Sequence, residues 1–517
     1  MTDVVIFSDT SRPGIWLRGI GPYSLAATLR NYNYSVEVID FISAISYDYF
    51  CKLCKKYLSE NTKIIGISTT WISSLDTFTT DLKSSYDKKK IKSNQMFFDP
   101  ELHAEYYDSF SWALTAKMHH RFINEIRKNA PNAKLILGGA RAVDFDDGES
   151  YDHIVLGYAE NELLDLLKDD ESFSYIVNHD VKGEKGIYNF HTSQTLYTKN
   201  DFIMDDETLA IEIGRGCVFK CKYCSFPLIG KKKLSYMKDL ELLREEFIKN
   251  WEEYNINRYI ISDDTFNDST EKLEILAELI ETLPFTPSFW CFARLDIMAV
   301  KFEQADLMKR IGIREVQFGV ESFNPKSAQV VGKGMAADKK KDTLYKLKDL
   351  WKDNIHIKCS FILGLPYETT LSLQDSFDWL SKEDCPIDMV GVNPFFLFRP
   401  DEKQHLRWNS ELDLKYKEYG YHFENAKHIF DWKKNDNTDI VSFDQCIELT
   451  KKWKLVLDQK TGGVTDAFYY ANCKSLNMTF EEMFNKETIG DIVQNNDWKR
   501  SYFDQVKTMY IHKKLGI

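Results

Sequence analysis

Hydrophobic and polar positions alternate along the first third of the chain in a way that predicts strands joined by helices. A short apolar run at 4–7, a helical periodicity at 22–33 and an alternating β-branched run at 35–41 together predict a βαβ unit. The pattern recurs through strands at 63–68, 133–137 and 153–156 and helices at 111–129 and 161–167. Five strands with helices between them predict a doubly wound parallel sheet over residues 1–170.

A second region of alternating strands and helices follows. Residues 171–208 are polar and weakly periodic, so we predict a connection there, and residues 72–110 predict an insertion in the first domain. Residues 209–400 predict a partial (β/α)6 barrel, and residues 401–517 a mainly helical C-terminal domain whose aromatic positions are typical of a core. The predicted barrel strands are 209–213, 258–262, 288–293, 315–318, 356–363 and 388–398, and the predicted C-terminal helices are 443–457, 480–484 and 498–512. The fold class is therefore α/β.

Composition and charge narrow the class of partner. The 517 residues carry a formal net charge of -12, which opposes long-range attraction to nucleic acid. No run approaches the roughly 18 apolar residues of a membrane span, and the N-terminus lacks a basic region followed by an apolar signal core. We therefore expect a cytoplasmic protein with no membrane partner, and we regard nucleic acid as a disfavoured partner.

Small and hydroxyl residues follow the strands of the first predicted domain. Ser68-Thr69-Thr70 ends one strand, Gly138-Gly139 ends the next and Gly157 ends a third. Ligands of doubly wound sheets bind beyond the carboxyl ends of the strands, where such residues let a ligand approach the backbone. The alternative interpretation is that these residues only form tight turns between strands and helices.

Three cysteines carry the strongest chemical signal. Cys217, Cys221 and Cys224 are spaced C-x3-C-x2-C directly after the first predicted barrel strand. A closed zinc site needs four protein ligands, and the fourth would have to come from a distant residue. An iron-sulfur cluster on three thiolates would leave one iron without a protein ligand. Cys51 and Cys54 form a C-x2-C pair within a predicted helix and are expected to be buried thiols, as are the five remaining, isolated cysteines.

The cysteine spacing, with the aromatic Tyr223 before the last cysteine, resembles the signature of the radical S-adenosylmethionine superfamily. The resemblance implies a [4Fe-4S] cluster on the three cysteines, whose open iron binds S-adenosylmethionine. It also implies a 5′-deoxyadenosyl radical as the reactive species and an electron donor such as flavodoxin or ferredoxin. A zinc site or a purely structural cluster is the alternative.

Residues after the other barrel strands resemble the S-adenosylmethionine contacts of that superfamily. Asp263-Asp264 would accept from the ammonium group or cap the next helix, and Arg294 would pair with the methionyl carboxylate or with Asp296. Glu321 would take the ribose hydroxyls, and Gly364 begins a turn like the family's adenine-contacting turn. The expected contacts are Tyr223, Asp264, Arg294, Glu321, Ser322, Gly364, Leu365 and Pro366.

A sheet domain ahead of such a barrel resembles the cobalamin-binding class of the superfamily. The resemblance implies cobalamin contacts at Ser68, Thr69, Thr70, Gly138, Gly139, Gly157, Tyr158 and Glu160. One departure is that the chain contains no Asp-x-His triplet, whose histidine often binds cobalt from below. We therefore expect cobalamin without histidine ligation, and a sheet that serves only as a scaffold is the alternative.

The function implied by the resemblance is methyl transfer to an unactivated carbon of a small molecule or peptide. The enzymatic alternative is a radical rearrangement or oxidation without methyl transfer. The alternative from another class is a noncatalytic cobalamin or redox sensor.

Overall fold

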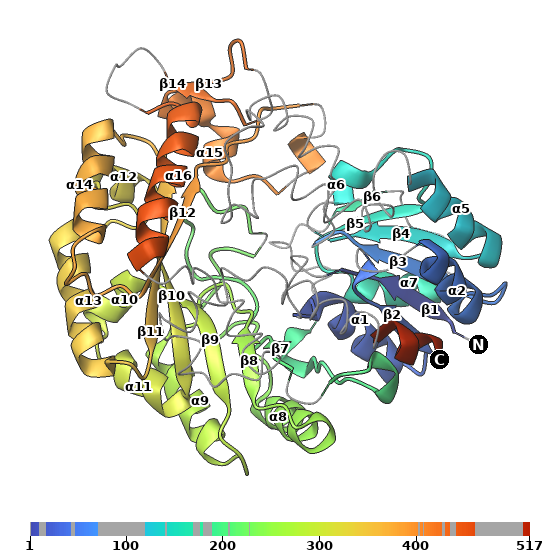
Figure 1. Ribbon diagram of the computed structural model, residues 1–517. Helices are drawn as coiled ribbons and strands as arrows, with labels where there is room; N and C mark the ends of the chain where they lie inside the picture. The colour runs from blue at the N-terminus through green and yellow to red at the C-terminus, as the bar shows by residue number, and fades with distance from the viewer. Residues whose placement is uncertain are drawn as a thin grey trace. The chain divides into compact units, whose positions relative to one another are not determined.

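The computed structural model describes two compact units (Figure 1). One unit comprises Met1–Ala210, Lys249–Ile256 and Gln494–Ile517, and the other comprises Ile211–Ile248 and Asn257–Val493. The residues described are 2–9, 17–42, 47–70, 119–139, 142–168, 176–178, 189–204, 207–226, 228–401, 404–406, 408–426, 430–434, 441–460 and 510–516. The predicted insertion at 72–110 and the predicted helix at 480–484 lie outside these residues. No helix among them is long and apolar enough to cross a membrane.

The first unit contains a six-stranded sheet in the order β2-β1-β3-β4-β5-β6, whose pairs are parallel. This confirms the predicted parallel sheet, and its order is that of a flavodoxin-like doubly wound fold. Its strands are β1 Val4–Phe7, β2 Val36–Ile39, β3 Ile64–Ser68, β4 Lys134–Gly138, β5 His153–Leu156 and β6 Ile176–Asn178. The last strand falls in the range that the sequence assigned to a connection, because three residues are too short to show a period.

Helices connect these strands, as a doubly wound sheet requires. Helix α1 contacts α7, and α2 contacts α5. The helices are α1 Ile20–Asn31, α2 Tyr47–Tyr57, α5 His119–Asn129, α6 Ala142–Phe145 and α7 Glu160–Leu167. Strand β1 is wholly buried, which explains why its sequence is a continuous apolar run without alternation.

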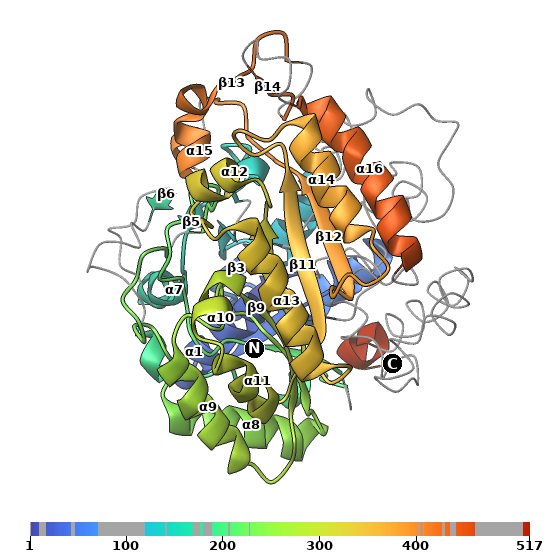
Figure 2. The same ribbon diagram turned by 90° about the vertical axis from the view of Figure 1, so that its left-hand side faces the viewer.

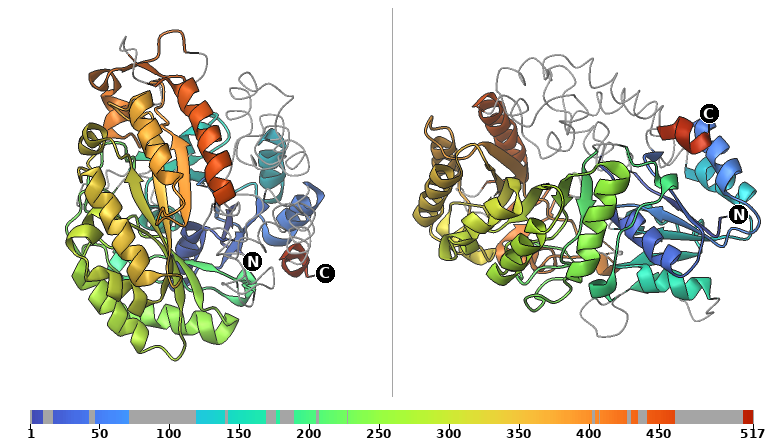
Figure 3. Two further views of the ribbon diagram at one scale, coloured as in Figure 1. Left: turned by 60° about the vertical axis from the view of Figure 1, so that its left-hand side comes forward. Right: turned by 90° about the horizontal axis from the view of Figure 1, so that it is seen from below.

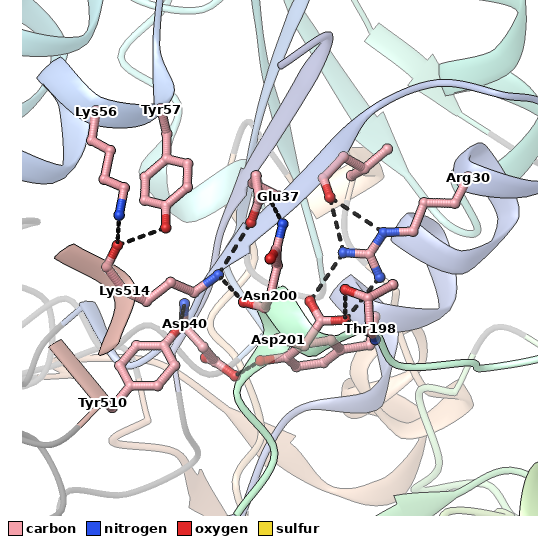
Figure 4. Close-up of polar contacts among 12 residues, drawn as sticks. Arg30, Glu37, Asp40, Lys56, Tyr57, Thr198, Asn200, Asp201, Tyr510 and Lys514 are labelled. Atoms are coloured by element: carbon pink, nitrogen blue, oxygen red, sulfur yellow. Dashed lines mark hydrogen bonds and ion pairs between the residues drawn. The ribbon is translucent and has the colours of Figure 1, made fainter. Parts of the chain in front are cut away.

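The end of the chain packs on the edge of this sheet near β2 (Figure 4). The Lys514 ammonium is fully buried, 3.3 Å from Glu37 Oε2, and it donates to the backbone oxygen of Asn200 at 2.7 Å. The Tyr510 hydroxyl accepts from the backbone N–H of Asp40. Residues 477 positions apart in sequence therefore pack together in this unit.

The second unit contains a six-stranded sheet whose strands lie in chain order, β12-β11-β10-β9-β8-β7. Its strands are β7 Leu209–Ile211, β8 Arg258–Ile261, β9 Ser288–Ala293, β10 Ile313–Glu321, β11 His356–Leu363 and β12 Met389–Pro394. The pairs from β8 to β12 are parallel. Helices separate the strands, as in the predicted partial (β/α)6 barrel.

The helices of this unit cover one face of its sheet, with α13 and α14 in front of β11 and β12 (Figure 2, Figure 3). Phe318 of β10, for example, stacks on the buried Trp351 of α13. The helices are α8 Leu240–Tyr254, which runs from the second unit into the first, α9 Thr270–Glu281, α10 Leu295–Val300, α11 Gln304–Ile311, α12 Pro325–Val330, α13 Ala337–Trp351 and α14 Thr370–Leu380.

The segment after the barrel contains helices and a small hairpin. Helix α15 Glu411–Leu414 is followed by β13 Tyr421–His422 and β14 Lys433–Lys434, which pair antiparallel. Helix α16 Phe443–Lys460 contacts β12. Within the part of the chain that the structure describes, residues 408–460 thus extend the barrel unit.

Candidate functional site

The three cysteines lie on a loop after β7, and backbone hydrogen bonds between the two ends of this loop fix its conformation. The Cys217 N–H donates to the backbone oxygen of Leu228 at 2.8 Å, and the Gly230 N–H donates to the Cys217 oxygen at 2.7 Å. Gly216 has a φ of +81°, and a Cβ there would lie 2.5 Å from the Leu228 side chain. Only glycine fits that position, which explains the Gly-Cys pair in the motif.

The thiols on this loop are suited to a metal cluster. Burial raises the pKa of Cys217 and raises that of Cys224 to about 11, so metal binding must displace these protons. Among the described residues, no three Cys, His, Asp or Glu side chains converge as ligands of one metal ion would. The thiolates of a four-iron cluster bind different irons and need not converge on one point. Three thiolates on one loop therefore fit a four-iron cluster that has one iron without a protein ligand.

Asp263 and Asp264 follow β8 and have different surroundings. Asp263 Oδ1 accepts from the backbone N–H groups of Ile213 and Gly214 at 2.8 and 2.9 Å, and its Oδ2 lies 3.4 Å from Lys272. Burial, and then the charge of Asp263, raises the pKa of Asp264 to about 7. Helix α9 is preceded by Ser269, so neither aspartate is its N-cap. Asp263 therefore supports the backbone before the cysteine loop, and Asp264 remains the candidate contact of S-adenosylmethionine.

Arg294 ends β9 and turns toward the cysteine loop. Its Nη1 donates to Cys221 Sγ at 3.0 Å, and its Nε and Nη2 donate to Asp296 at 2.9 and 2.5 Å. The Arg294 side chain is 4% exposed and that of Asp296 is 24% exposed, so the ion pair is partly buried.

Tyr223 and Glu321 are joined across the site. The Tyr223 hydroxyl donates to Glu321 Oε1 at 2.7 Å, and Lys333 Nζ lies 3.6 Å from the same oxygen. Glu321 has a φ of +63°, which is unusual for a residue with a side chain and is found where function demands strain. A Cβ on Gly319 would lie 2.4 Å from Glu321 Oε1, so the glycine two residues earlier makes room for the carboxylate.

A second chain of hydrogen bonds joins β10 to the turn after β11. The Ser322 hydroxyl donates to Glu368 Oε1 at 2.6 Å, and the Gly364 N–H donates to Glu368 Oε2 at 2.8 Å. Burial raises the pKa of Glu368 to about 7 and lowers that of the nearby Lys434 to about 8. Leu365 and Pro366, which complete the turn, are buried. The structure therefore brings together Ser322 and the predicted adenine-contacting turn.

The candidate cobalamin contacts lie together at the carboxyl ends of β3, β4 and β5. Thr69 is fully buried, and both its N–H and its hydroxyl donate to the Gly138 oxygen at 2.8 Å. A Cβ on Gly139, whose φ is +96°, would lie 2.7 Å from the Thr70 nitrogen. Thr69 and Gly139 thus hold two strand ends close together, while Thr70 is exposed. Ser68, Gly138, Gly157 and Tyr158 are half-buried, and Glu160 is buried in α7.

Sequence reasoning missed several residues of the site. Thr265 Oγ1 lies 3.2 Å from Cys217 Sγ, and its place directly after Asp263-Asp264 was a usable signal. Lys333 stands between two glycines, which also marked a loop worth considering. Tyr421 donates to the Gly364 oxygen at 2.8 Å and Lys434 to the Leu365 oxygen at 2.9 Å, and neither gave any local signal.

The fold and the site define an α/β protein with a three-cysteine loop after the first strand of a partial barrel. Residues 211–380 match the Radical SAM superfamily, and this part of the chain is a radical SAM domain, as predicted. An uncharacterized methyltransferase of Pyrococcus horikoshii is 29% identical over 171 residues, which cover 33% of this chain and 36% of that relative. The chain thus spans about a third of the length of the curated relative that it matches.

Solved structures share the fold over most of the chain. The radical S-adenosylmethionine methyltransferase TsrM from Kitasatospora setae, with cobalamin and a [4Fe-4S] cluster bound, has a TM-score of 0.63 at 12% identity and covers 96% of this chain and 100% of its own. The cobalamin-dependent S-adenosylmethionine radical enzyme OxsB, with aqua-cobalamin and S-adenosylmethionine bound, has a TM-score of 0.51 at 13% identity and covers 99% and 79%. At these identities the likeness shows the fold.

Proposed function

We propose that this chain is a cobalamin-dependent radical S-adenosylmethionine methyltransferase that modifies an unactivated carbon of a small molecule or peptide. The observation that carries the proposal is the loop with Cys217, Cys221 and Cys224 at the end of β7 in a radical SAM domain. When bound on these thiolates, the cluster would supply the electron for cleavage of S-adenosylmethionine to a 5′-deoxyadenosyl radical, the species that would take a hydrogen atom from the substrate. Flavodoxin or ferredoxin is the class of protein that would deliver this electron.

The chain's own residues bind and orient the cofactors. The three thiolates would hold the cluster, and Glu321, whose carboxylate accepts from the Tyr223 hydroxyl, would accept from the ribose hydroxyls. The turn at Gly364 is fixed by Glu368 before the nucleoside binds. Such preorganisation reduces the ordering cost of binding and aims the nucleoside at one substrate hydrogen.

Cobalamin would bind at the carboxyl ends of β3, β4 and β5 and supply the methyl group. The exposed Thr70, the half-buried Ser68 and the open backbone at Gly157, with a φ of +120°, fit a polar, nucleotide-like tail. The chain contains no Asp-x-His triplet, so we propose that the benzimidazole tail is displaced and that no histidine nitrogen binds cobalt. An unsplit cobalt(II) paramagnetic resonance signal would support this, and a nitrogen-split signal would overturn it.

The proposal is tested by anaerobic reconstitution with iron, sulfide and cobalamin, followed by reduction and addition of methyl-labelled S-adenosylmethionine to a metabolite extract. We expect 5′-deoxyadenosine, and a metabolite that gains the labelled methyl group. Cys217→Ala, Cys221→Ala and Cys224→Ala should each abolish both products. Cys385→Ala is the matched control, because this thiol is also partly exposed but lies outside the loop.

Two outcomes would contradict the proposal. A modified metabolite without label would replace methyl transfer by a rearrangement or oxidation. Full iron content in the triple cysteine variant would remove the cluster from this loop.

A further inference from the structure

The Arg294 guanidinium contacts the cysteine loop, and its side chain is 4% exposed. It donates from Nη1 to Cys221 Sγ at 3.0 Å, and its Cζ lies 3.8 Å from the centre of the Phe219 ring. Phe219 stands between Cys217 and Cys221 in the loop. The guanidinium therefore contacts both a ligand thiol and the residue that separates two of the ligands.

The donors of Arg294 are almost all in use. A guanidinium has five N–H groups, arranged so that two edges can each present a pair to a carboxylate. Nε and Nη2 form one edge, and both donate to Asp296. The other edge is formed by Nη1 and Nη2, which donate to Cys221 Sγ and to the Gly332 oxygen at 3.0 Å each. No edge remains that could bind the carboxylate of S-adenosylmethionine with two hydrogen bonds.

We infer that Arg294 is a positioning residue for the cluster, which sets its reduction potential through Cys221, and not the residue that binds the methionyl carboxylate. The inference rests on the proposed function for the presence of the cluster. Reduction adds one electron, taken from an external donor, and makes the cluster more negative. A buried cation that donates to a thiolate ligand stabilises this more negative state, so it raises the potential.

Asp296 gives the inference a second, opposite test. Its carboxylate pairs with Arg294 and compensates part of the positive charge that reaches Cys221. Removing the carboxylate charge leaves more of the guanidinium's charge uncompensated. Arg294→Gln should therefore lower the potential, whereas Asp296→Asn should raise it. A residue that only supports the loop would give no such reversal of sign.

The experiment is a potentiometric titration of the reconstituted cluster in the full chain, read by paramagnetic resonance without S-adenosylmethionine or substrate. At the midpoint potential of the wild-type cluster, we expect the ratio of reduced to oxidised cluster to fall about tenfold in Arg294→Gln, which for one electron is about 59 mV. Arg294→Lys keeps the charge but loses the planar fork, and its potential should fall between the two. Arg310→Gln is the matched control, because Arg310 forms an exposed ion pair with Glu281 in the same unit.

Each outcome decides the inference. Potentials that move in opposite directions in Arg294→Gln and Asp296→Asn support it. Unchanged potentials on intact clusters, or shifts of one sign in both variants, overturn it while leaving the proposed function in place. If Arg294→Gln assembles no cluster, the potentials of Arg294→Lys and Asp296→Asn still show whether the two shifts have opposite signs. A wild-type chain that assembles no cluster defeats the proposed function and this inference with it.

Discussion

Tyr421→Phe removes one hydroxyl from the hairpin that packs against the predicted adenine-contacting turn. Tyr421 is 1% exposed, and its hydroxyl donates to the Gly364 oxygen at 2.8 Å. The surroundings are closely packed, since a Cβ on Gly364 would lie 2.7 Å from Cys446 Sγ and from the Trp432 ring. Phenylalanine therefore fills the same space but leaves a carbonyl oxygen without this donor.

The magnitude follows from the loss of one buried hydrogen bond. Leaving a buried acceptor unsatisfied costs about 1–3 kcal/mol, so the free energy of unfolding should fall by that amount. The same turn should be less well ordered before ligand binding. If about 1 kcal/mol of the loss appears in binding, the Kd for S-adenosylmethionine rises about fivefold.

The assay combines denaturant unfolding with calorimetric titration of S-adenosylmethionine into the reconstituted protein. Tyr345→Phe is the matched control, because Tyr345 is exposed on α13 and its hydroxyl lies 3.4 Å from Asp384 in the turn after α14. The reasoning is refuted if Tyr421→Phe leaves both unfolding and affinity unchanged, or if the control changes them equally.

Three further changes test the fold of the first unit. Burial, and then the charges of Glu160 and Asp165, raises the pKa of Glu162 from 4.5 to about 7. The contribution of Glu162 to the free energy of unfolding is therefore present below pH 4.5 and lost as the pH rises through 7. Compared with the wild type, Glu162→Gln should gain about 1–3 kcal/mol in the free energy of unfolding between pH 4.5 and pH 8. A difference that does not depend on pH, or the same gain in the exposed Glu149→Gln, would contradict this expectation. Lys514→Met leaves Glu37 without its buried cation and should cost about 3 kcal/mol in denaturant unfolding, whereas equal stability to the exposed Lys513→Met would show that the buried pair contributes nothing. Gly139→Ala should destabilise by about 1 kcal/mol or more beyond Gly148→Ala, since both glycines have a positive φ but only Gly139 has backbone atoms where a Cβ would lie, and equal losses would contradict this steric argument.

The strand ends and the cysteine loop could be predicted because their signals are local. The C-x3-C-x2-C spacing lies on one loop, and the residues Glu321 and Gly364 each follow a strand whose hydrophobic pattern is clear. Parallel strands in a barrel present their carboxyl ends at one edge, so local positions were enough to place these residues together. In the structure, the Tyr223 hydroxyl donates to Glu321, which lies 98 residues later in the sequence.

The partners of the predicted residues could not be read from the sequence. Asp296 is only two positions from Arg294, so that ion pair is local. Nothing in the neighbouring sequence indicates that Arg294 Nη1 also donates to Cys221, 73 residues earlier. The hairpin residues Tyr421 and Lys434 contact the turn at Gly364 through long-range packing, and their own sequence shows only aromatic and charged residues. Burial of charges such as Lys514 is likewise decided by tertiary packing, since lysine is ordinarily a surface residue.

We propose that the three cysteines support radical cleavage of S-adenosylmethionine coupled to methyl transfer. The most direct measurement is mass spectrometry of products from the reduced, cobalamin-loaded protein given methyl-labelled S-adenosylmethionine and a metabolite extract. We expect 5′-deoxyadenosine together with a labelled methyl group on one metabolite. Both products should be lost in Cys221→Ala and retained in Cys385→Ala. Labelled methyl transfer that persists in Cys221→Ala, or no 5′-deoxyadenosine from a fully loaded and reduced protein, would contradict it.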